Sequence, residues 1–235
     1  MALQKRLTAL LLILLLSVGC EILSGCSRVQ SNVRRGSRAD GSVVYAAIGD
    51  STGAGVGARH GGYVERLFVK IKQERPASRL VNQSLAGADT AQVLQKQIEK
   101  ISSDNPTLVT VGIGLNDLLR GTSEDDFAKN YEDIVARLLK TQAFIILITL
   151  PDLSAAPAFS QRDAGELSAR LLRYNQRIEI IAARYNVSLV DLYKLSRESL
   201  QKHPEFFSAD GMHPSDAGYE YWAELLWPAV SKALN

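Results

Sequence analysis

The pattern of hydrophobic and polar positions predicts strands and helices that alternate along the chain from about residue 43 onward. Short apolar runs rich in β-branched residues predict strands at 43–48, 79–82, 107–113, 143–150 and 187–190. Apolar residues three and four positions apart predict helices at 62–74, 90–101, 123–139, 167–185 and 192–201. A last helix follows, and Pro214 is expected just inside its start, where the missing N–H costs nothing.

Five strands separated by helices imply a parallel sheet that is covered on both faces. Right-handed crossovers then give a three-layer α/β/α sandwich around a doubly wound sheet of about five strands, in the flavodoxin-like manner. In such folds the site lies at the carboxyl ends of the strands, so polar motifs are expected directly after strands. The 235 residues suit one folded domain, which we place at 42–235.

The N-terminal residues have the pattern of a targeting signal. Lys5 and Arg6 precede an apolar run at 7–18, which is short for a transmembrane helix and typical of a signal peptide. The residues Leu23-Ser24-Gly25-Cys26 then resemble a bacterial lipobox, in which the cysteine is lipidated and becomes the new N-terminus. Cys20 is a second candidate, and a plain secretory signal with an incidental cysteine is the alternative reading.

We therefore expect a signal peptide at 1–25, followed by a lipidated Cys26 and a flexible tether at 26–41. Acyl chains on Cys26 would hold the protein on a membrane, because each buried CH₂ contributes ~0.8 kcal/mol. Ser27 follows the cysteine in place of the aspartate that retains lipoproteins in the inner membrane. This favours the outer membrane in a cell with two membranes, with the domain facing the periplasm or the exterior.

Composition excludes several classes of partner and site. A net charge of +2 and 7% aromatic residues give no reason to expect binding to nucleic acid. Both cysteines lie in the first 26 residues, so the predicted domain has no disulfide and no cysteine nucleophile. The three histidines form no metal-binding pattern, and no metal or organic cofactor is predicted. His60 and His203 are expected at the surface, and the protein is expected to be a monomer.

Four motifs carry candidate chemistry, three of them directly after predicted strands. They are Gly49-Asp50-Ser51, Asn82–Gly87, Gly114-Leu115-Asn116-Asp117 and Asp210-Gly211-Met212-His213. Together, in this order, they resemble the blocks of the SGNH, or GDSL, hydrolase family. The resemblance covers roughly residues 43–225, and Thr52 stands where the first block usually has leucine.

The resemblance implies a serine esterase and assigns a role to each residue. Ser51 is the nucleophile, which needs an adjacent base, and His213 is that base. Asp210 holds the imidazole tautomer and stabilises the imidazolium. The backbone N–H groups of Ser51 and Gly87 and the side-chain amide of Asn116 form the oxyanion hole. Asp117 is expected to be structural.

The expected substrate is a small-molecule or lipid carboxylic ester, cleaved through an acyl-enzyme. The family includes lysophospholipases, thioesterases, arylesterases and carbohydrate acetylesterases. The apolar segment 151–159, together with Phe206 and Phe207, favours an acyl pocket and so a lipid or acyl ester. A carbohydrate or cell-wall O-acetylesterase is the alternative within the same fold.

Two alternatives from other classes stay open at this point. The glycine-rich stretch 49–57 could cradle a phosphate on backbone N–H groups, although it matches neither GxGxxG nor a Walker A motif. The chain could also be an inactive binding module that is anchored at the surface and has kept a hydrolase fold.

Overall fold

A parallel sheet forms the centre of the part of the chain that the structure describes, which is residues 36–160 and 164–235 of a computed structural model. In these residues five strands lie in the order β2-β1-β3-β4-β5, and each adjacent pair is parallel. The strands are β1 (Val44–Gly49), β2 (Arg79–Asn82), β3 (Leu108–Gly112), β4 (Phe144–Ile148) and β5 (Ser188–Val190). The order reverses between β1 and β3, which confirms the predicted doubly wound fold.

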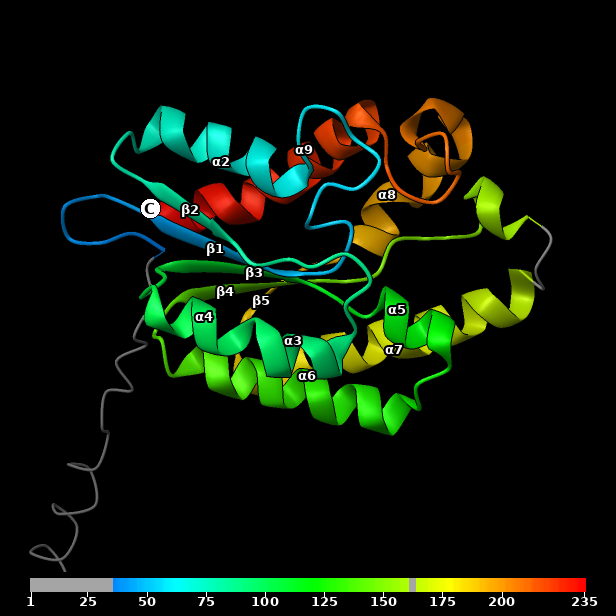
Figure 1. Cartoon of the computed structure of the whole chain (residues 1–235), viewed down its shortest axis with the longest axis horizontal. Coiled ribbons are helices and arrows are strands. Elements are labelled where there is room, and N and C mark those ends of the chain that lie inside the picture. The colour runs from blue at the N-terminus through cyan, green and yellow to red at the C-terminus, as the bar shows by residue number, and fades with distance from the viewer. Residues whose placement is uncertain (1–35, 161–163) are drawn as a thin grey trace, which may run out of the picture. The chain divides into compact units, whose positions relative to one another are not determined.

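Helices cover both faces of this sheet (Figure 1). One layer contains α3 (Thr90–Lys96), α4 (Ile98–Ser103), α5 (Leu115–Arg120), α6 (Glu124–Leu139) and α7 (Ala164–Tyr185). The other contains α2 (Tyr63–Glu74), α8 (Leu192–Lys202) and α9 (Asp216–Leu234). Alternate residues of β1 enter separate hydrophobic clusters on the two sides of the sheet, as expected from the two-residue period of a strand. β1 is buried along its whole length, so its carboxyl end is held in a fixed place.

The predicted elements differ from the observed ones at several places. The helix expected at 90–101 is divided into α3 and α4, with Gln97 between them. The short helix α5 and the 3₁₀ turns η1 (Pro157–Phe159) and η2 (Pro204–Phe206) were not predicted. The expectation for Pro214 was wrong: α9 begins at Asp216, and Ser215 caps it by accepting a hydrogen bond from the Gly218 N–H.

The predicted signal peptide, the lipidated Cys26 and most of the predicted tether lie outside the described residues. The last residues of the predicted tether contact the domain, because the Gly36 N–H donates to the carbonyl of Ala233 at 2.8 Å. The Gly36 carbonyl in turn accepts a hydrogen bond from the Thr107 hydroxyl at 2.7 Å. No helix in the described ranges is long and apolar enough to cross a membrane.

Candidate active site

Ser51 lies in a tight turn at the carboxyl end of β1, where the order of the strands reverses. The preceding residue Asp50 accepts hydrogen bonds from both the N–H and the hydroxyl of Thr52, at 2.9 and 2.8 Å. Ser51 itself is only 6% exposed. Burial raises the pKa of Asp50, whereas the hydrogen bonds from Thr52 act in the opposite direction. These contacts fix the direction in which the Ser51 side chain leaves the strand.

The Ser51 hydroxyl meets a histidine and an aspartate that lie far away in the sequence. Its Oγ is 2.8 Å from His213 Nε2, and His213 Nδ1 is 2.6 Å from Asp210 Oδ2. The loop between η2 and α9 presents Asp210 and His213, and the residue spacing of three lets one turn aim both side chains at Ser51. The structure therefore brings the three predicted catalytic residues together in one chain of hydrogen bonds.

Asp210 is held as a carboxylate by its surroundings. Its Oδ1 accepts hydrogen bonds from the Ser208 hydroxyl and from the backbone N–H groups of Met212 and His213, at 2.8, 2.8 and 2.9 Å. Burial alone would raise the pKa of Asp210, but the bond from the His213 side chain and these three donors together hold it well below its usual range. An ionised Asp210 favours the tautomer of His213 with the proton on Nδ1, which leaves Nε2 free to accept the proton of Ser51.

Replacing Asp210 by asparagine should lower the stability of the protein near neutral pH and have little effect in strong acid. A carboxylate whose pKa falls on folding stabilises the native state above the unfolded pKa of about 3.9, and this contribution is lost as the pH falls toward the folded value. Thermal melts of the wild type and Asp210→Asn between about pH 7 and about pH 2 measure the difference. A difference in melting temperature that did not change with pH would contradict this explanation.

The three donors that were predicted for the oxyanion hole have no partner among the described residues. They are the backbone N–H groups of Ser51 and Gly87 and the second amide hydrogen of Asn116, whose first is donated to the Ala88 carbonyl at 2.8 Å. Gly87 has a φ of +78°, a conformation in which any other residue would be strained. The three donors follow β1, β2 and β3, whose carboxyl ends lie along one edge of the sheet. They are suited to receive an oxygen that becomes negatively charged.

The short helix α5 holds the loop that carries Gly87. Asp117, which is 1% exposed, accepts hydrogen bonds from the N–H and the hydroxyl of Thr90 at 2.9 and 2.6 Å. Arg120 donates to the Gly87 carbonyl and to Asp89 Oδ2, both at 2.7 Å. Asp117 therefore has the structural place that we expected. Arg120 was missed, because its partners lie 33 and 31 residues away and leave no local pattern in the sequence.

Gln97 is a second residue that the sequence did not reveal, and it explains the break between α3 and α4. Its buried side-chain amide accepts a hydrogen bond from the Gly49 N–H at 3.0 Å and donates to the Gly49 carbonyl at 2.9 Å. The same carbonyl also accepts from the Leu85 N–H. Gln97 thus fixes the end of β1 two residues before Ser51.

Replacing Gln97 by alanine should destabilise the protein by about 1–3 kcal/mol, because the buried Gly49 N–H would lose the amide oxygen that accepts its hydrogen bond. Denaturant unfolding measures this change in the free energy of unfolding. Gln95→Ala is the matched control, since Gln95 is an exposed residue of α3. Equal unfolding midpoints for the two variants would show that the hydrogen bonds between Gln97 and Gly49 do not stabilise the protein.

The glycine-rich loop at 49–57 is not arranged to hold a phosphate. Most of its backbone N–H groups are already used inside the protein, at Gly49, Thr52, Ala54, Gly55 and Val56. A phosphate cradle needs several free N–H groups that point to one centre. The remaining donor of interest is the Ser51 N–H, which lies next to the Ser51 hydroxyl. The geometry therefore disfavours the phosphate-binding alternative.

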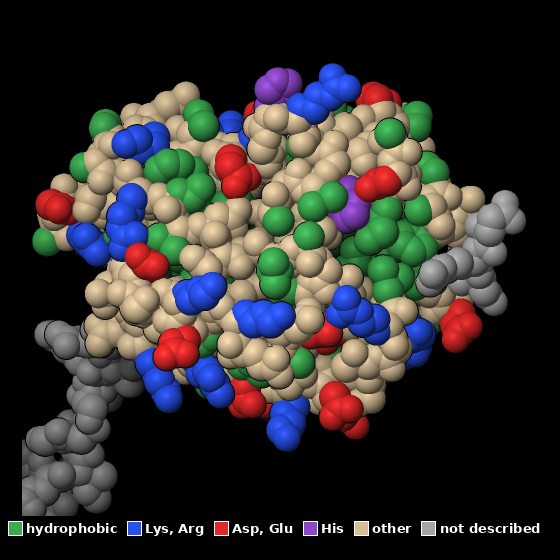
Figure 2. Space-filling view, viewed as in Figure 1, with side chains coloured by type: hydrophobic (Ala, Val, Ile, Leu, Met, Phe, Trp, Pro, Cys, Tyr) green, Lys and Arg blue, Asp and Glu red, His purple; other side chains and the backbone are tan. Residues whose placement is uncertain are grey.

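An apolar cavity opens directly beside His213. Pro151, Leu153, Phe206 and Phe207, which the sequence suggested for an acyl pocket, all line it. The other lining residues are Thr52, Leu115, Asp152, Leu200, Met212, His213, Pro214 and Trp222. The remaining hydrophobic residues of the 151–159 segment do not line the cavity. Figure 2 shows hydrophobic side chains gathered next to a histidine and an acidic residue on this face of the domain.

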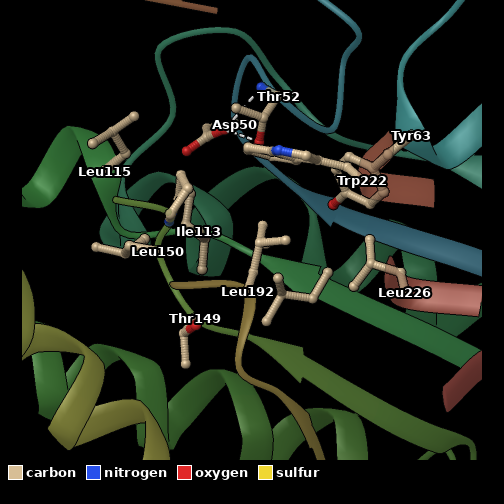
Figure 3. Close-up of a pocket in the computed structure, with 13 residues that line it drawn as sticks. Asp50, Thr52, Tyr63, Ile113, Leu115, Thr149, Leu150, Leu192, Trp222 and Leu226 are labelled. Atoms are coloured by element: carbon tan, nitrogen blue, oxygen red, sulfur yellow. Dashed lines mark hydrogen bonds between the residues drawn. The ribbon is translucent and has the colours of Figure 1, made fainter. Parts of the chain in front are cut away.

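A second cavity lies between the ends of β3 and β4 and helix α9 (Figure 3). Thr52, Leu115, Pro151 and Trp222 line both cavities, so the two cavities adjoin. The second cavity differs in its polar groups, since the Tyr63 hydroxyl and Trp222 Nε1 are buried without a hydrogen-bond partner in the described structure. The two rings lie 6.2 Å apart, centre to centre.

The other two histidines lie at the surface, as expected. The His60 side chain is 79% exposed beside Asp216, and His203 contacts Glu205 at the surface. Across residues 36–160 and 164–235 no group of three or more His, Cys, Asp or Glu side chains is placed to hold a metal ion.

A doubly wound sheet that carries a serine, a histidine and an aspartate in this geometry defines a serine hydrolase. The comparison with known families agrees. The model of the GDSL-like Lipase/Acylhydrolase family matches residues 47–221, and the chain therefore belongs to this family. It is an enzyme that hydrolyses carboxylic esters, which removes the alternative of an inactive binding module.

Two curated relatives are esterases. Over 188 residues the chain is 24% identical to Esterase TesA of Pseudomonas aeruginosa, a match that covers 80% of this chain and 87% of that protein. Over 193 residues it is 27% identical to the GDSL-like esterase Rv1075c of Mycobacterium tuberculosis, covering 80% of this chain and 62% of that protein.

Solved structures share the fold. One is the acetyl xylan esterase AlAXEase, with a TM-score of 0.66 and 24% identity, which covers 80% of this chain and all of that one. Another is LAE5, an α/β hydrolase from the metagenome of Lake Arreo, with a TM-score of 0.68 and 27% identity over 82% of this chain and 96% of that one.

Proposed function

We propose that Ser51 is the nucleophile of this esterase, with His213 as its general base and Asp210 as the residue that orients the histidine. The observation that carries the proposal is the continuous hydrogen-bonded chain from Ser51 Oγ through both nitrogens of His213 to Asp210 Oδ2. A serine hydroxyl becomes nucleophilic when a base takes its proton during attack. The three free donors, on Ser51, Gly87 and Asn116, then stabilise the oxyanion.

The reaction proceeds in two halves. In the first, Ser51 Oγ attacks the carbonyl carbon and its proton passes to His213 Nε2, which gives it to the alcohol oxygen as the ester C–O bond breaks. In the second, His213 takes a proton from water, which attacks the acyl-enzyme, and returns that proton to Ser51 Oγ as the acid departs. No residue changes its protonation state over the complete cycle.

The substrate proposed is an ester with an apolar acyl group, because an apolar cavity adjoins both Thr52 and His213. An acetylester of a carbohydrate or cell-wall polymer is a second candidate, and the fold shared with an acetyl xylan esterase supports it. The test compares kcat/KM for a p-nitrophenyl ester, a lysophospholipid and an acetylated oligosaccharide at equal enzyme concentration. Hydrolysis of the acetylated oligosaccharide alone would favour the second candidate, and hydrolysis of none would contradict the proposed function.

We further propose that Cys26 anchors the enzyme to a membrane, with the outer membrane as the destination in a cell with two membranes. The support is the lipobox-like Leu23-Ser24-Gly25-Cys26 after an apolar run. Cells that express Cys26→Ala should show neither lipid labelling nor membrane association of the enzyme, whereas Cys20→Ala should behave as the wild type. The reverse pattern would make Cys20 the anchor.

A further inference from the structure

We propose that Asn82 is a positioning residue for ester hydrolysis, because its side chain joins the turn that carries Ser51 to the loop that carries Gly87. The inference rests on the proposed function, since it assumes that the N–H groups of Ser51 and Gly87 both receive the oxyanion. Asn82 is the first residue of the Asn82–Gly87 motif, and the last residue of that motif supplies one of these donors. The hydrogen bonds of the Asn82 amide and the close packing at Gly53 support this role.

Asn82 is the last residue of β2, the strand that lies beside β1 in the sheet. It pairs with Ala47 of β1, and the loops that follow the two parallel strands leave the sheet at the same end (Figure 1). The loop after β2 stays against β1, because the Leu85 N–H donates to the Gly49 carbonyl at 3.1 Å. The side chain of Asn82 is therefore within reach of both loops.

The amide nitrogen of Asn82 holds the segment that follows Ser51. Its Nδ2 donates to the Gly53 carbonyl at 2.8 Å, two residues after Ser51. It also donates to Glu65 Oε1 at 2.9 Å, while Glu65 Oε2 accepts from the Gly62 N–H next to the start of α2. The nitrogen of Asn82 thus fixes both the turn after Ser51 and the beginning of the helix to which that turn leads.

The oxygen of the same amide holds the start of the loop that leads to Gly87. Asn82 Oδ1 accepts a hydrogen bond from the Ser84 N–H at 3.0 Å, as asparagine side chains commonly do two residues along in a turn. Arg120 holds the other end of this loop through the Gly87 carbonyl. One planar amide therefore sets the position of the Gly87 loop relative to the Ser51 turn.

Close packing at Gly53 makes the positions of the two loops depend on each other. A Cβ atom on Gly53 would stand 2.3 Å from Ser84 Oγ and 2.9 Å from Ser84 Cβ, so the side chain of Ser84 lies directly against the turn. Ser84 Oγ is buried without a hydrogen-bond partner in the described structure, so this contact is one of packing alone. The hydrogen bonds of Asn82 supply the direction that the packing contact lacks.

The position of the two N–H donors relative to each other decides how well they bind one oxygen. Each donor has to lie about 2.7–3.1 Å from the oxyanion. A displacement of about 1 Å in an active site can lower the rate about 10²-fold. Both halves of the reaction pass through a tetrahedral oxyanion, so loss of the Asn82 hydrogen bonds should lower kcat and leave the binding of the substrate nearly unchanged.

The test uses Asn82→Asp in the full chain. This change keeps the shape of the side chain and an oxygen that can accept from the Ser84 N–H. It replaces the amide donors by an oxygen that faces the Gly53 carbonyl and the Glu65 carboxylate. We expect kcat for a p-nitrophenyl ester to fall about 10- to 100-fold, with KM close to that of the wild type. Initial rates over a range of ester concentrations, taken well below the melting temperature of each variant, measure both constants.

Arg79→Ala is the matched control, because Arg79 begins the same strand and donates to the side chain and the carbonyl of Asp104. It should keep the kcat of the wild type even where the melting temperature falls. Glu65→Gln separates the two bonds of the Asn82 nitrogen, since it leaves the Gly53 carbonyl as an acceptor. It should lower kcat less than Asn82→Asp does.

A folded Asn82→Asp enzyme with the kcat of the wild type would overturn the inference, as would a raised KM as its only defect. If Asn82→Asp does not fold, Asn82→Ala removes the same donors without adding a charge, and the same outcomes decide. Activity in Ser51→Ala would instead contradict the proposed function. An inactive Ser51→Ala beside a fully active Asn82→Asp would refute the role of Asn82 and leave the proposed function standing.

Discussion

Replacing Ser51 by alanine should abolish ester hydrolysis without unfolding the protein. The change removes the oxygen that His213 deprotonates and leaves the turn intact, because the bonds of Asp50 to Thr52 involve no atom of the Ser51 side chain. Loss of a catalytic serine lowers kcat by on the order of 10⁶-fold. Initial rates with a p-nitrophenyl ester, together with a thermal melt, measure both parts of the expectation.

Ser103→Ala is the matched control for this experiment, since Ser103 is an exposed serine at the end of α4. It should retain the activity of the wild type. A folded Ser51→Ala enzyme with near-wild-type activity would show that the proposed mechanism is wrong.

Replacing Asn116 by alanine should lower kcat by about 10²- to 10³-fold, equivalent to about 2.7–4 kcal/mol, and leave KM nearly unchanged. We propose that the free amide hydrogen of Asn116 bonds to the carbonyl oxygen of the ester only in the transition state, when that oxygen becomes negatively charged. A group used only in the transition state lowers kcat and kcat/KM together, whereas a group that binds the substrate equally well raises KM. Steady-state kinetics over a range of ester concentrations separates the two cases.

Asn116 also supports the loop that follows Gly87, so its effect on catalysis needs a control for the loop. Asn130 on α6 provides it, because its amide donates to the Thr90 hydroxyl at 3.2 Å. Asn130→Ala should reduce kcat much less than Asn116→Ala. A raised KM as the only defect of Asn116→Ala would exclude Asn116 from the oxyanion hole and leave the roles of Ser51, His213 and Asp210 untouched.

The periodic elements of the fold were predictable because each depends on residues close together in the sequence. The β2 range was predicted residue for residue, and Ser123 caps α6 where the sequence placed the start of that helix. The break at Gln97 was not predictable, since apolar residues continue at helical spacing on both sides of it. What turns Gln97 inward is its bond to Gly49, which is 48 residues away.

The candidate site was predictable to the extent that its residues stand in motifs at the ends of strands. Ser51 and Asn116 were found in this way, and the Asp210–His213 pair was found from its motif before the last helix; the structure brings Ser51, His213 and Asp210 together. The supporting contact of Arg120 with Gly87 has no such motif. The cavity beside His213 could not be predicted in full either, because residues from many separate segments of the chain line it jointly.

Direct detection of the acyl-enzyme tests the central proposal most closely. The protein is incubated with a p-nitrophenyl ester, quenched in acid within the first turnovers and examined by mass spectrometry, both intact and after digestion. We expect one acyl group per chain on the peptide that contains Ser51, and none in Ser51→Ala. An acyl group on a different residue, or rapid turnover with no covalent adduct under any quench time, would contradict a mechanism that passes through Ser51.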